Sequence, residues 1–319
     1  MLGFEQVHIG MSENNSALTG CTVLLFDGGA RASADIRGAA PGTRETALLA
    51  PDKQMDRVDA ILLTGGSAYG LAAANGVVRY LSERGRGYKT PWNVVPIVSA
   101  AVIYDLNIGA NDVFPDDEMG YQSCVSAEKG EFISGSHGAG IGATVGKWAG
   151  AEFAMKSGQG KATLQIGQLK VSAVVVVNCV GDVIGSDGQV IAGAIKGENI
   201  IIQDTKNVSR ILSAPISGMN TTLCVVVTNA SFNKADLNRI AQRGHDAFAR
   251  KIVPVHTSFD GDTVFAVSLE EVDAPLDVVA GMAVDAIEMA IEDAVISAEP
   301  LNGLPAYSDI HKSSTPRAN

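Results

Sequence analysis

Two apolar, β-branched stretches decide the fold: LKVSAVVVVN at 169–178 and TTLCVVVTNA at 221–230. A strand that faces water on one side alternates apolar and polar residues, whereas a continuous apolar run is typical of a strand covered on both faces. We therefore expect the first stretch at the centre of a sheet. The second starts abruptly at the dipeptide Asn220-Thr221, because residues 196–218 are polar and poorly periodic and are expected to form an exposed connection.

Other elements are predicted outward from these two strands by the period of their apolar residues. Strands and helices mix without the strict alternation of a doubly wound sheet, which favours an α/β (α+β) sandwich with helices outside two packed sheets. Nothing indicates a second core, so residues 1–319 are predicted to form a single domain, and the tail from residue 307 is expected to be frayed. The further strands are expected at 21–26, 59–66, 94–106, 162–167, 183–193 and 262–268, and the helices at 67–84, 237–252 and 276–297.

Composition excludes several classes of protein. Hydrophobic residues make up 46% of the 319 residues and charged residues 18%, which excludes a disordered chain. No run of about 18 consecutive apolar residues is present, so no membrane span is expected. The net charge is −11 without a basic cluster, which argues against nucleic-acid binding. The four cysteines lack ligand spacing and are expected to be buried free thiols. No secretory signal is visible, so a cytoplasmic location is expected.

Two glycine-rich segments are candidate functional loops. TGGSAYG at 64–70 has neither of the two glycine spacings of nucleotide-binding loops, GxxxxGK[ST] and GxGxxG. Its turn, Gly65-Gly66-Ser67, either packs tightly or offers backbone N–H groups as an oxyanion hole. SGSHGAGIGATVGK at 134–147 ends at Lys147. A lone lysine is usually solvated, but this apolar, glycine-dense approach leaves a placed cation as the alternative.

Polar residues beside the strands are a second group of candidates. Asn178 ends the most apolar strand, where its amide either caps the structure or serves a site. Asp260 and Asp262 in FDGDT lie on one side if that segment is extended. An Asp-Gly-Asp is usually a turn, and the functional alternatives are a metal or an amine between two like charges. Because no further oxygen ligands follow at EF-hand spacing, an amine partner is favoured over a metal.

Thr221 is the candidate nucleophile. No GxSxG elbow is present and the cysteines lack a catalytic signature. A threonine that becomes the first residue of a chain carries its own base, because a free α-amine has a pKa of about 7.7–8.0 and lies within reach of the hydroxyl.

At these residues the chain resembles the self-processing L-aminopeptidase/D-esterase family, which includes the nylon-oligomer hydrolases and β-peptidyl aminopeptidases. The resemblance covers nearly the whole chain. Its motifs are LTGCTVLLF at 18–26, RGAAPGTRET at 37–46, LTGGSAYGL at 63–71, VSAAVIYD at 98–105, GAGIGATVGK at 138–147, VVVNCVGDV at 175–183, NTTLCVVVTNA at 220–230 and PVHTSFDGDTVFAVS at 254–268.

The resemblance implies a four-layer αββα sandwich that cuts itself between Asn220 and Thr221. The products would be an α chain, 1–220, and a β chain, 221–319, which stay together and assemble into a homo-oligomer, a tetramer or larger. The implied activity is hydrolysis of small peptides, amino acid amides or ω-amino acid oligomers through an acyl-enzyme on Thr221, with no metal and no organic cofactor.

The resemblance also implies a role for each site residue. Thr221 would be the nucleophile, and together with Lys147 and the aspartate pair it resembles the nylon-oligomer hydrolase branch. Two alternatives stay open: an acyltransferase of the ornithine acetyltransferase type, whose Ala-Thr junction is absent here, and an uncleaved, non-catalytic homologue. The other implied roles are Asn178 as an oxyanion or substrate donor, Tyr104 and Lys147 as active-site side chains, Asp260 and Asp262 as the partners of the new amine, and Gly65, Gly66 and Ser67 as oxyanion donors.

Overall fold

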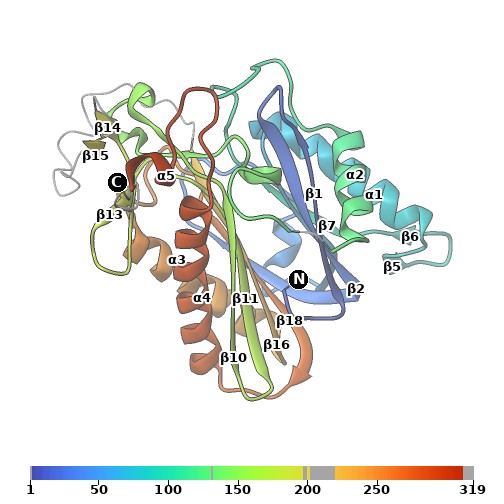
Figure 1. Cartoon of the computed structure of the whole chain (residues 1–319). Coiled ribbons are helices and arrows are strands. Elements are labelled where there is room, and N and C mark those ends of the chain that lie inside the picture. The colour runs from blue at the N-terminus through green and yellow to red at the C-terminus, as the bar shows by residue number, and fades with distance from the viewer. Residues whose placement is uncertain (1, 131, 197–199, 202–219, 312–319) are drawn as a thin grey trace, which may run out of the picture.

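The computed structural model describes residues 2–130, 132–196, 200–201 and 220–311. Most of the polar connection predicted at 196–218 therefore lies outside the described residues. Figure 1 shows strands at the centre of the molecule, with α3 (Lys234–Lys251) and α4 (Leu276–Ile296) on one side and α1 (Ala73–Glu83) and α2 (Asp117–Ala127) on the other.

The main sheet has the strand order β10-β11-β16-β18-β2-β4-β7-β3, and β1 pairs with β2. Its strands are β1 (Val7–Asn14), β2 (Thr19–Ile36), β3 (Thr43–Arg44), β4 (Arg57–Thr64), β7 (Val98–Val102), β10 (Gln159–Ile166), β11 (Leu169–Asn178), β16 (Thr221–Ala230) and β18 (Thr263–Val272). The short strands are β5 (Tyr88–Lys89), β6 (Val94–Val95), β8 (Thr144–Val145), β9 (Met155–Lys156), β12 (Asp182–Ile184), β13 (Val190–Ala192), β14 (Ile195–Lys196), β15 (Ile200–Ile201) and β17 (Ile252–Val253). The remaining helix is α5 (Tyr307–Ile310).

One long strand, β2, joins the two halves of this sheet. Its last residues pair with β18, while its first residues pair with β1 and β4. Between Leu25 and Ala30 the register with β4 shifts, and Gly28 and Gly29 have φ of 74° and 73° there. Glycine tolerates such positive φ without strain, and a bulge of this kind bends a strand. The two packed sheets expected from the sequence are thus one hydrogen-bonded sheet that continues through β2.

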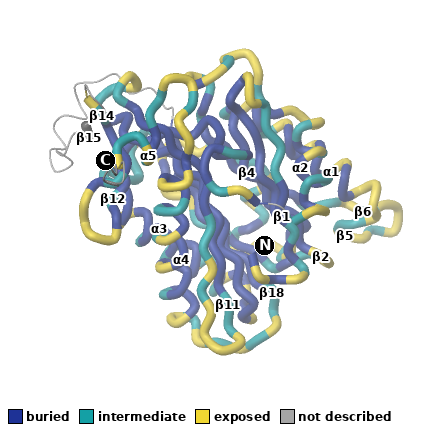
Figure 2. The backbone as a smooth tube through the Cα atoms, viewed as in Figure 1, coloured by how far each residue is buried: buried dark blue, intermediate teal, exposed yellow. Residues whose placement is uncertain are grey.

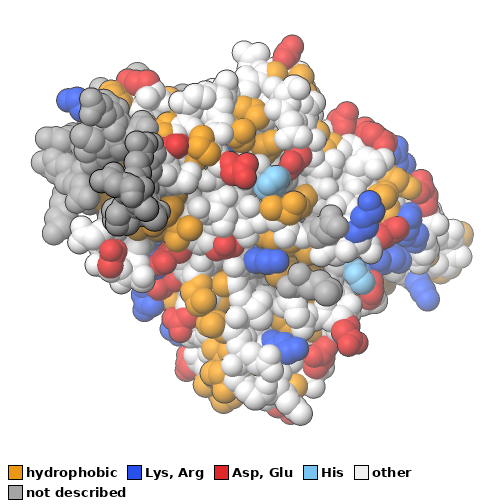
Figure 3. Space-filling model, in the orientation of Figure 1, with side chains coloured by type: hydrophobic (Ala, Val, Ile, Leu, Met, Phe, Trp, Pro, Cys, Tyr) orange, Lys and Arg blue, Asp and Glu red, His pale blue; other side chains and the backbone are white. Residues whose placement is uncertain are grey.

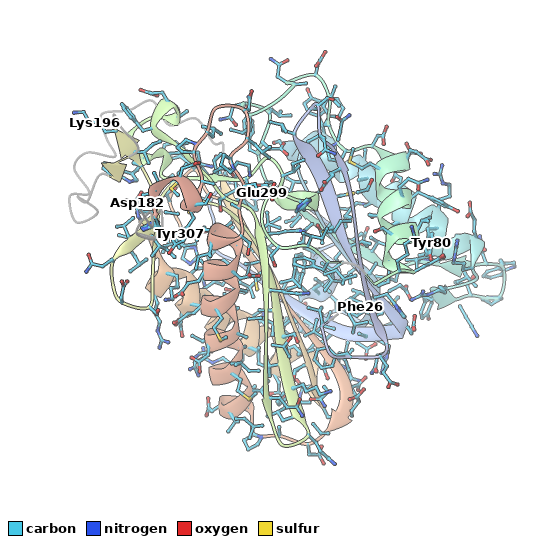
Figure 4. All side chains as sticks on the ribbon, in the orientation of Figure 1. Phe26, Tyr80, Asp182, Lys196, Glu299 and Tyr307 are labelled. Atoms are coloured by element: carbon cyan, nitrogen blue, oxygen red, sulfur yellow. The ribbon has the colours of Figure 1, made fainter. Side chains whose placement is uncertain are left out.

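Three apolar cores separate four layers, and the central strands contribute to two of them. On β11, Val175 and Val177 pack in the core under α3 and α4, whereas Val174 and Val176 pack in the core between the two halves of the sheet. Phe26 of β2, labelled in Figure 4, belongs to that middle core. A third core lies between β2, β4, β7 and the helices α1 and α2. The four-layer αββα arrangement is confirmed, and Figure 2 shows its strands as the buried centre.

Several elements differ from the sequence predictions. The single strand expected at 183–193 is a hairpin of β12 and β13. The helix expected at 67–84 begins as a 3-10 helix, η2 (Ser67–Ala72), before α1 starts. Strand β1 and helix α2 were not predicted, although Asp116 caps α2 by accepting the N–H of Met119. The tail is helical in α5 rather than frayed there.

The cysteine prediction is confirmed, because Cys21, Cys124, Cys179 and Cys224 are buried free thiols. None of the helices in the described part of the chain is both long and apolar enough to cross a membrane. On the face in Figure 3, Lys and Arg side chains are scattered among Asp and Glu side chains.

Candidate active site

The pairing of β11 with β16 brings the predicted nucleophile to the predicted amide. The two strands run antiparallel, and Asn178 is the register partner of Thr221. On its other side β16 runs parallel to β18, with Leu223 opposite Thr263, so the residues just before β18 arrive beside the start of β16. The backbone N–H of Gly261 donates to Thr221 Oγ1 at 3.0 Å. Sheet topology therefore gathers three distant segments around the junction at Asn220-Thr221.

A cavity of about 150 Å³ opens onto this junction. Its walls come from four places in the chain: residues 40–42, residues 67–68, the end of β7 with Tyr104, and Asn220-Thr221 itself. Tyr104 and Ser67, both predicted from the sequence as site residues, are thus brought to the predicted cut. The cavity is large enough for a small acyl group next to the Thr221 side chain.

Lys147 is a buried lysine that contacts Asn178. Its Nζ donates to Asn178 Oδ1 at 2.8 Å and to the Asn178 carbonyl oxygen at 3.1 Å. Burial lowers the pKa of Lys147 from 10.5 to about 8, although nearby anionic groups, among them Asp260, oppose the shift. The solvated lysine that the sequence left open is excluded, because Lys147 is only 4% exposed.

The Asn178 amide is oriented by its partners. Its Oδ1 also accepts the N–H of Thr144 at 3.0 Å, and its Nδ2 donates to the Tyr104 carbonyl oxygen at 2.9 Å. The Thr144 hydroxyl also donates to Oδ1, at 3.4 Å. Three donors at the oxygen and an acceptor at the nitrogen distinguish the two ends of the amide. Tyr104 uses one of the two Nδ2 hydrogens.

The two aspartates are both buried, and each has its own set of donors. Asp262 Oδ1 accepts the Thr222 N–H at 2.7 Å, and its Oδ2 contacts the backbone N–H and the Nδ1 of His256 at 3.2 and 2.7 Å. Asp260 Oδ2 accepts the backbone N–H of Thr257 at 3.1 Å and also its hydroxyl. Burial, and then the neighbouring Asp262, raise the pKa of Asp260.

A metal site has no support in the part of the chain that the structure describes. There, no cluster of three or more His, Cys, Asp or Glu side chains is arranged to hold an ion. Asp262 Oδ1 instead accepts the backbone N–H of Thr222, the residue that follows Thr221.

The Gly65-Gly66-Ser67 turn does not offer its own N–H groups to the cavity. These groups donate to the Gly20 carbonyl oxygen at 2.9 Å, to Asp105 Oδ1 at 2.7 Å and to the Ile103 carbonyl oxygen at 2.9 Å, respectively. In this structure all three N–H groups are thus used within the fold, and their oxyanion role stays a prediction. The tight-packing alternative holds, and only Ser67 of the three borders the cavity.

Sequence reasoning assigned no role to the loop at 37–40. The N–H groups of Arg37 and Gly38 donate to the Asp262 carbonyl oxygen at 3.0 and 3.3 Å, and that of Ala40 donates to the Asp260 carbonyl oxygen at 2.9 Å. A Cβ on Gly38 would lie 2.2 Å from the Asp262 nitrogen, so only glycine permits this approach. Gly38, the first of the two glycines in RGAAPGTRET, was the available signal for this approach.

Known proteins share the family and the fold of this chain. The model of Peptidase family S58 matches residues 3–307, and the chain belongs to that family. An uncharacterized aminopeptidase of Mycobacterium leprae is 39% identical over 321 residues, covering 90% of this chain and 85% of the relative. A 6-aminohexanoate-oligomer endohydrolase of Agromyces sp. is 36% identical over 279 residues, covering 85% of this chain and 75% of the relative.

Solved structures share the fold at low sequence identity. The L-aminopeptidase D-Ala-esterase/amidase of Ochrobactrum anthropi, described as a variant of the Ntn hydrolase fold, has a TM-score of 0.72 at 19% identity and covers 94% of this chain and 86% of its own. A β-aminopeptidase of Burkholderia sp. has a TM-score of 0.69 at 18% identity and covers 95% and 89%. The predicted family resemblance is confirmed: the chain belongs to Peptidase family S58 and is a hydrolase that acts on amide bonds. Its fold is the one that these solved structures share.

Proposed function

We propose that this hydrolase is self-processing: it cuts the Asn220-Thr221 bond and then uses Thr221 as an N-terminal nucleophile on small amide substrates. The observation that carries the proposal is the backbone of Thr221, whose φ is +134° at a buried junction that borders the cavity. A β-branched residue rarely adopts such a conformation, which costs on the order of 1–3 kcal/mol. Cutting the bond before Thr221 relieves that strain.

Maturation needs only groups of this chain and water. The Thr221 hydroxyl oxygen adds to the Asn220 carbonyl carbon, the C–N bond breaks, and the freed nitrogen takes the hydroxyl proton to become the Thr221 amine. The resulting ester between Asn220 and the Thr221 side chain is hydrolysed by water, which leaves a carboxylate on Asn220. The Gly261 N–H supports this step, because it donates to Thr221 Oγ1 and leaves the hydroxyl proton free to move.

The same groups serve the mature enzyme. The Thr221 hydroxyl attacks a substrate amide, the α-amine accepts the proton, and an acyl-enzyme forms and is hydrolysed. The Lys147 ammonium and the second Nδ2 hydrogen of Asn178 are the proposed donors to the oxyanion, and precedents put one such donor at about 3 kcal/mol. Asp262, with Asp260 next to it, balances the charge of the Thr221 ammonium.

The two products are expected to stay together as one unit. Strand β11 of the α chain, 1–220, pairs with β16 of the β chain, 221–319, along eight successive register pairs from Val171 to Asn178. Both strands are buried in the centre of the sheet, so separation would expose two apolar cores to water. We further propose that these αβ units assemble into a homo-oligomer and act on peptides, amino acid amides or ω-amino acid oligomers, the last because of the 6-aminohexanoate-oligomer relatives.

A pair of isosteric variants tests the proposal. Thr221→Val removes the hydroxyl and should give an intact, inactive chain in denaturing mass analysis, whereas the wild type should give chains 1–220 and 221–319. Thr222→Val is the matched control, because the Thr222 hydroxyl is buried with no hydrogen-bond partner in the described part of the chain. It should still process and hydrolyse amides. A full-length chain that hydrolyses 6-aminohexanoate oligomers or L- and D-amino acid amides without being cut would refute the mechanism.

A further inference from the structure

His256 contacts the buried Asp262 carboxylate twice. Its backbone N–H lies 3.2 Å and its ring Nδ1 2.7 Å from the same oxygen, Asp262 Oδ2. The other oxygen, Oδ1, accepts the N–H of Thr222 at 2.7 Å. The carboxylate therefore spans the distance between the histidine and the peptide that follows the proposed nucleophile.

The chemistry of the contact defines the tautomer of His256. An ionised Asp262 has no hydrogen to give, so Nδ1 must carry the proton in the bond to Oδ2. In a neutral imidazole the proton is then absent from Nε2. Consistent with this, Nε2 of His256 is buried and has no hydrogen-bond partner among the residues that the structure describes.

The backbone of His256 has a conformation that is energetically unfavourable for a non-glycine residue. His256 has φ of +52°, the left-handed region that non-glycine residues seldom adopt. This conformation brings the N–H and the ring Nδ1 to one oxygen. The ring itself packs against α3, with its centroid 4.8 Å from that of His245 and 6.2 Å from that of Phe248.

The titratable groups around His256 are His245, Asp35 and Asp260, and each makes a contact of its own. His245 of α3 contacts the Asp35 carbonyl oxygen at 3.1 Å, and burial lowers the pKa of His245 to about 4, so it is neutral at working pH. On β2, the Asp35 carboxylate is paired with Arg37 at 2.7 Å and lies 3.5 Å from His245 Nε2. Asp260 is the remaining anion in the same loop, and its Oδ2 accepts from Thr257. None of these groups replaces the donor that His256 offers to Asp262.

We propose that His256 is a positioning residue for catalysis: its Nδ1–H fixes the orientation of Asp262, so that the carboxylate meets the Thr221 ammonium formed when the α-amine takes the hydroxyl proton. The inference rests on the proposed function, since the ammonium exists only after the cut. His256 keeps its own proton throughout, and no bond to it forms or breaks. Without the Nδ1–H, the carboxylate loses its side-chain donor and can rotate away from the amine.

Two variants separate donation from packing. His256→Asn keeps an N–H donor near the position of Nδ1 but loses the ring, whereas His256→Phe keeps a ring against His245 and Phe248 but loses the donor. With a mature enzyme and an amino acid amide as substrate, His256→Phe should lower kcat about 10- to 100-fold with KM nearly unchanged, because a hydrogen bond to a charged group is lost. His256→Asn should retain kcat within about 5-fold, as expected for a retained donor. If the Phe variant is the faster of the two, the role is packing and the proposal fails.

The tautomer of His256 can be measured in the wild-type protein, so this test does not depend on the folding of a variant. The chain has 5 histidines, few enough to resolve by 15N NMR of the imidazole nitrogens. His256 should be the Nδ1–H tautomer at neutral pH, and an Nε2–H tautomer would overturn the proposal. Failure of the proposed function is recognised separately, in an uncut wild-type chain or an active Thr221→Val variant. Failure of this inference alone would leave self-cleavage and amide hydrolysis intact.

Discussion

Replacing Lys147 by Met tests whether a buried cation faces the proposed oxyanion. In the folded protein burial lowers the pKa of Lys147 from 10.5 to about 8. Between these two pH values the unfolded chain holds the proton and the folded chain does not, so the free energy of unfolding rises with pH across that window. The pKa difference corresponds to roughly 3 kcal/mol, as an order of magnitude. Below pH 8 the folded protein carries the whole penalty of the buried ammonium.

Methionine has a similar length and no charge, so the Lys147→Met variant lacks this contribution. At pH 7 the variant should be the more stable of the two proteins. This advantage in the free energy of unfolding should shrink by roughly 3 kcal/mol between pH 7 and pH 10.5, because the protein with Lys147 gains stability over that range. Urea unfolding in a Thr221→Ala background, which the proposed function predicts to stay uncut, gives this difference directly. The exposed Lys129 provides the control, because Lys129→Met removes a lysine from the surface.

The mature enzyme supplies a second, kinetic measurement of the same charge. In the proposed mechanism the Thr221 α-amine must be neutral to accept the hydroxyl proton. The value of kcat/KM should therefore rise with pH as this amine loses its proton, with a reference pKa of about 7.7–8.0. The Lys147 ammonium favours the neutral form of the amine. In the Lys147→Met variant the rise of kcat/KM, which is the acidic limb of the pH profile, should therefore move to higher pH, and the reaction should be slower. A pH-independent stability difference together with an unshifted limb would refute the placement of a buried cation beside the base.

Two further perturbations concern the aspartates and the glycine turn. Asp260→Asn and Asp262→Asn should each lower kcat strongly while the thermal midpoint changes little. Chelators should have no effect on the activity of the wild type. Activity lost with EDTA and restored by a divalent ion would make the pair a metal site. Gly65→Ala should lower the thermal midpoint, because its Cβ would lie 2.0 Å from Asp105 Oδ2. The helical Gly281 has no atom within 4 Å of its Cβ position, so Gly281→Ala should raise stability by about 0.5–1 kcal/mol in the same scan. Equal midpoints for the two glycine variants would contradict the packing argument.

The candidate site residues could be singled out in the sequence because each lies at a visible local feature. Thr221 begins an apolar strand after a polar segment, and Asn178 ends another. Lys147 follows a glycine-dense approach, and the structure shows that its side chain is buried. His256 was visible as part of a motif, but its contact with Asp262 was not, because a side-chain direction depends on the backbone φ that the folded loop imposes.

The sequence by itself determined the two central strands, since a run of β-branched residues without alternation is stable only between two apolar layers. It also determined the family, from many ordered motifs. Only the tertiary structure decided that Asn178 lies opposite Thr221, that loop 37–40 donates to the aspartate loop, and that the N–H groups of the turn at Gly65 are already used. These contacts join residues far apart in the chain. Strand register and loop approach arise from the packing of all four layers together, and no local pattern records them.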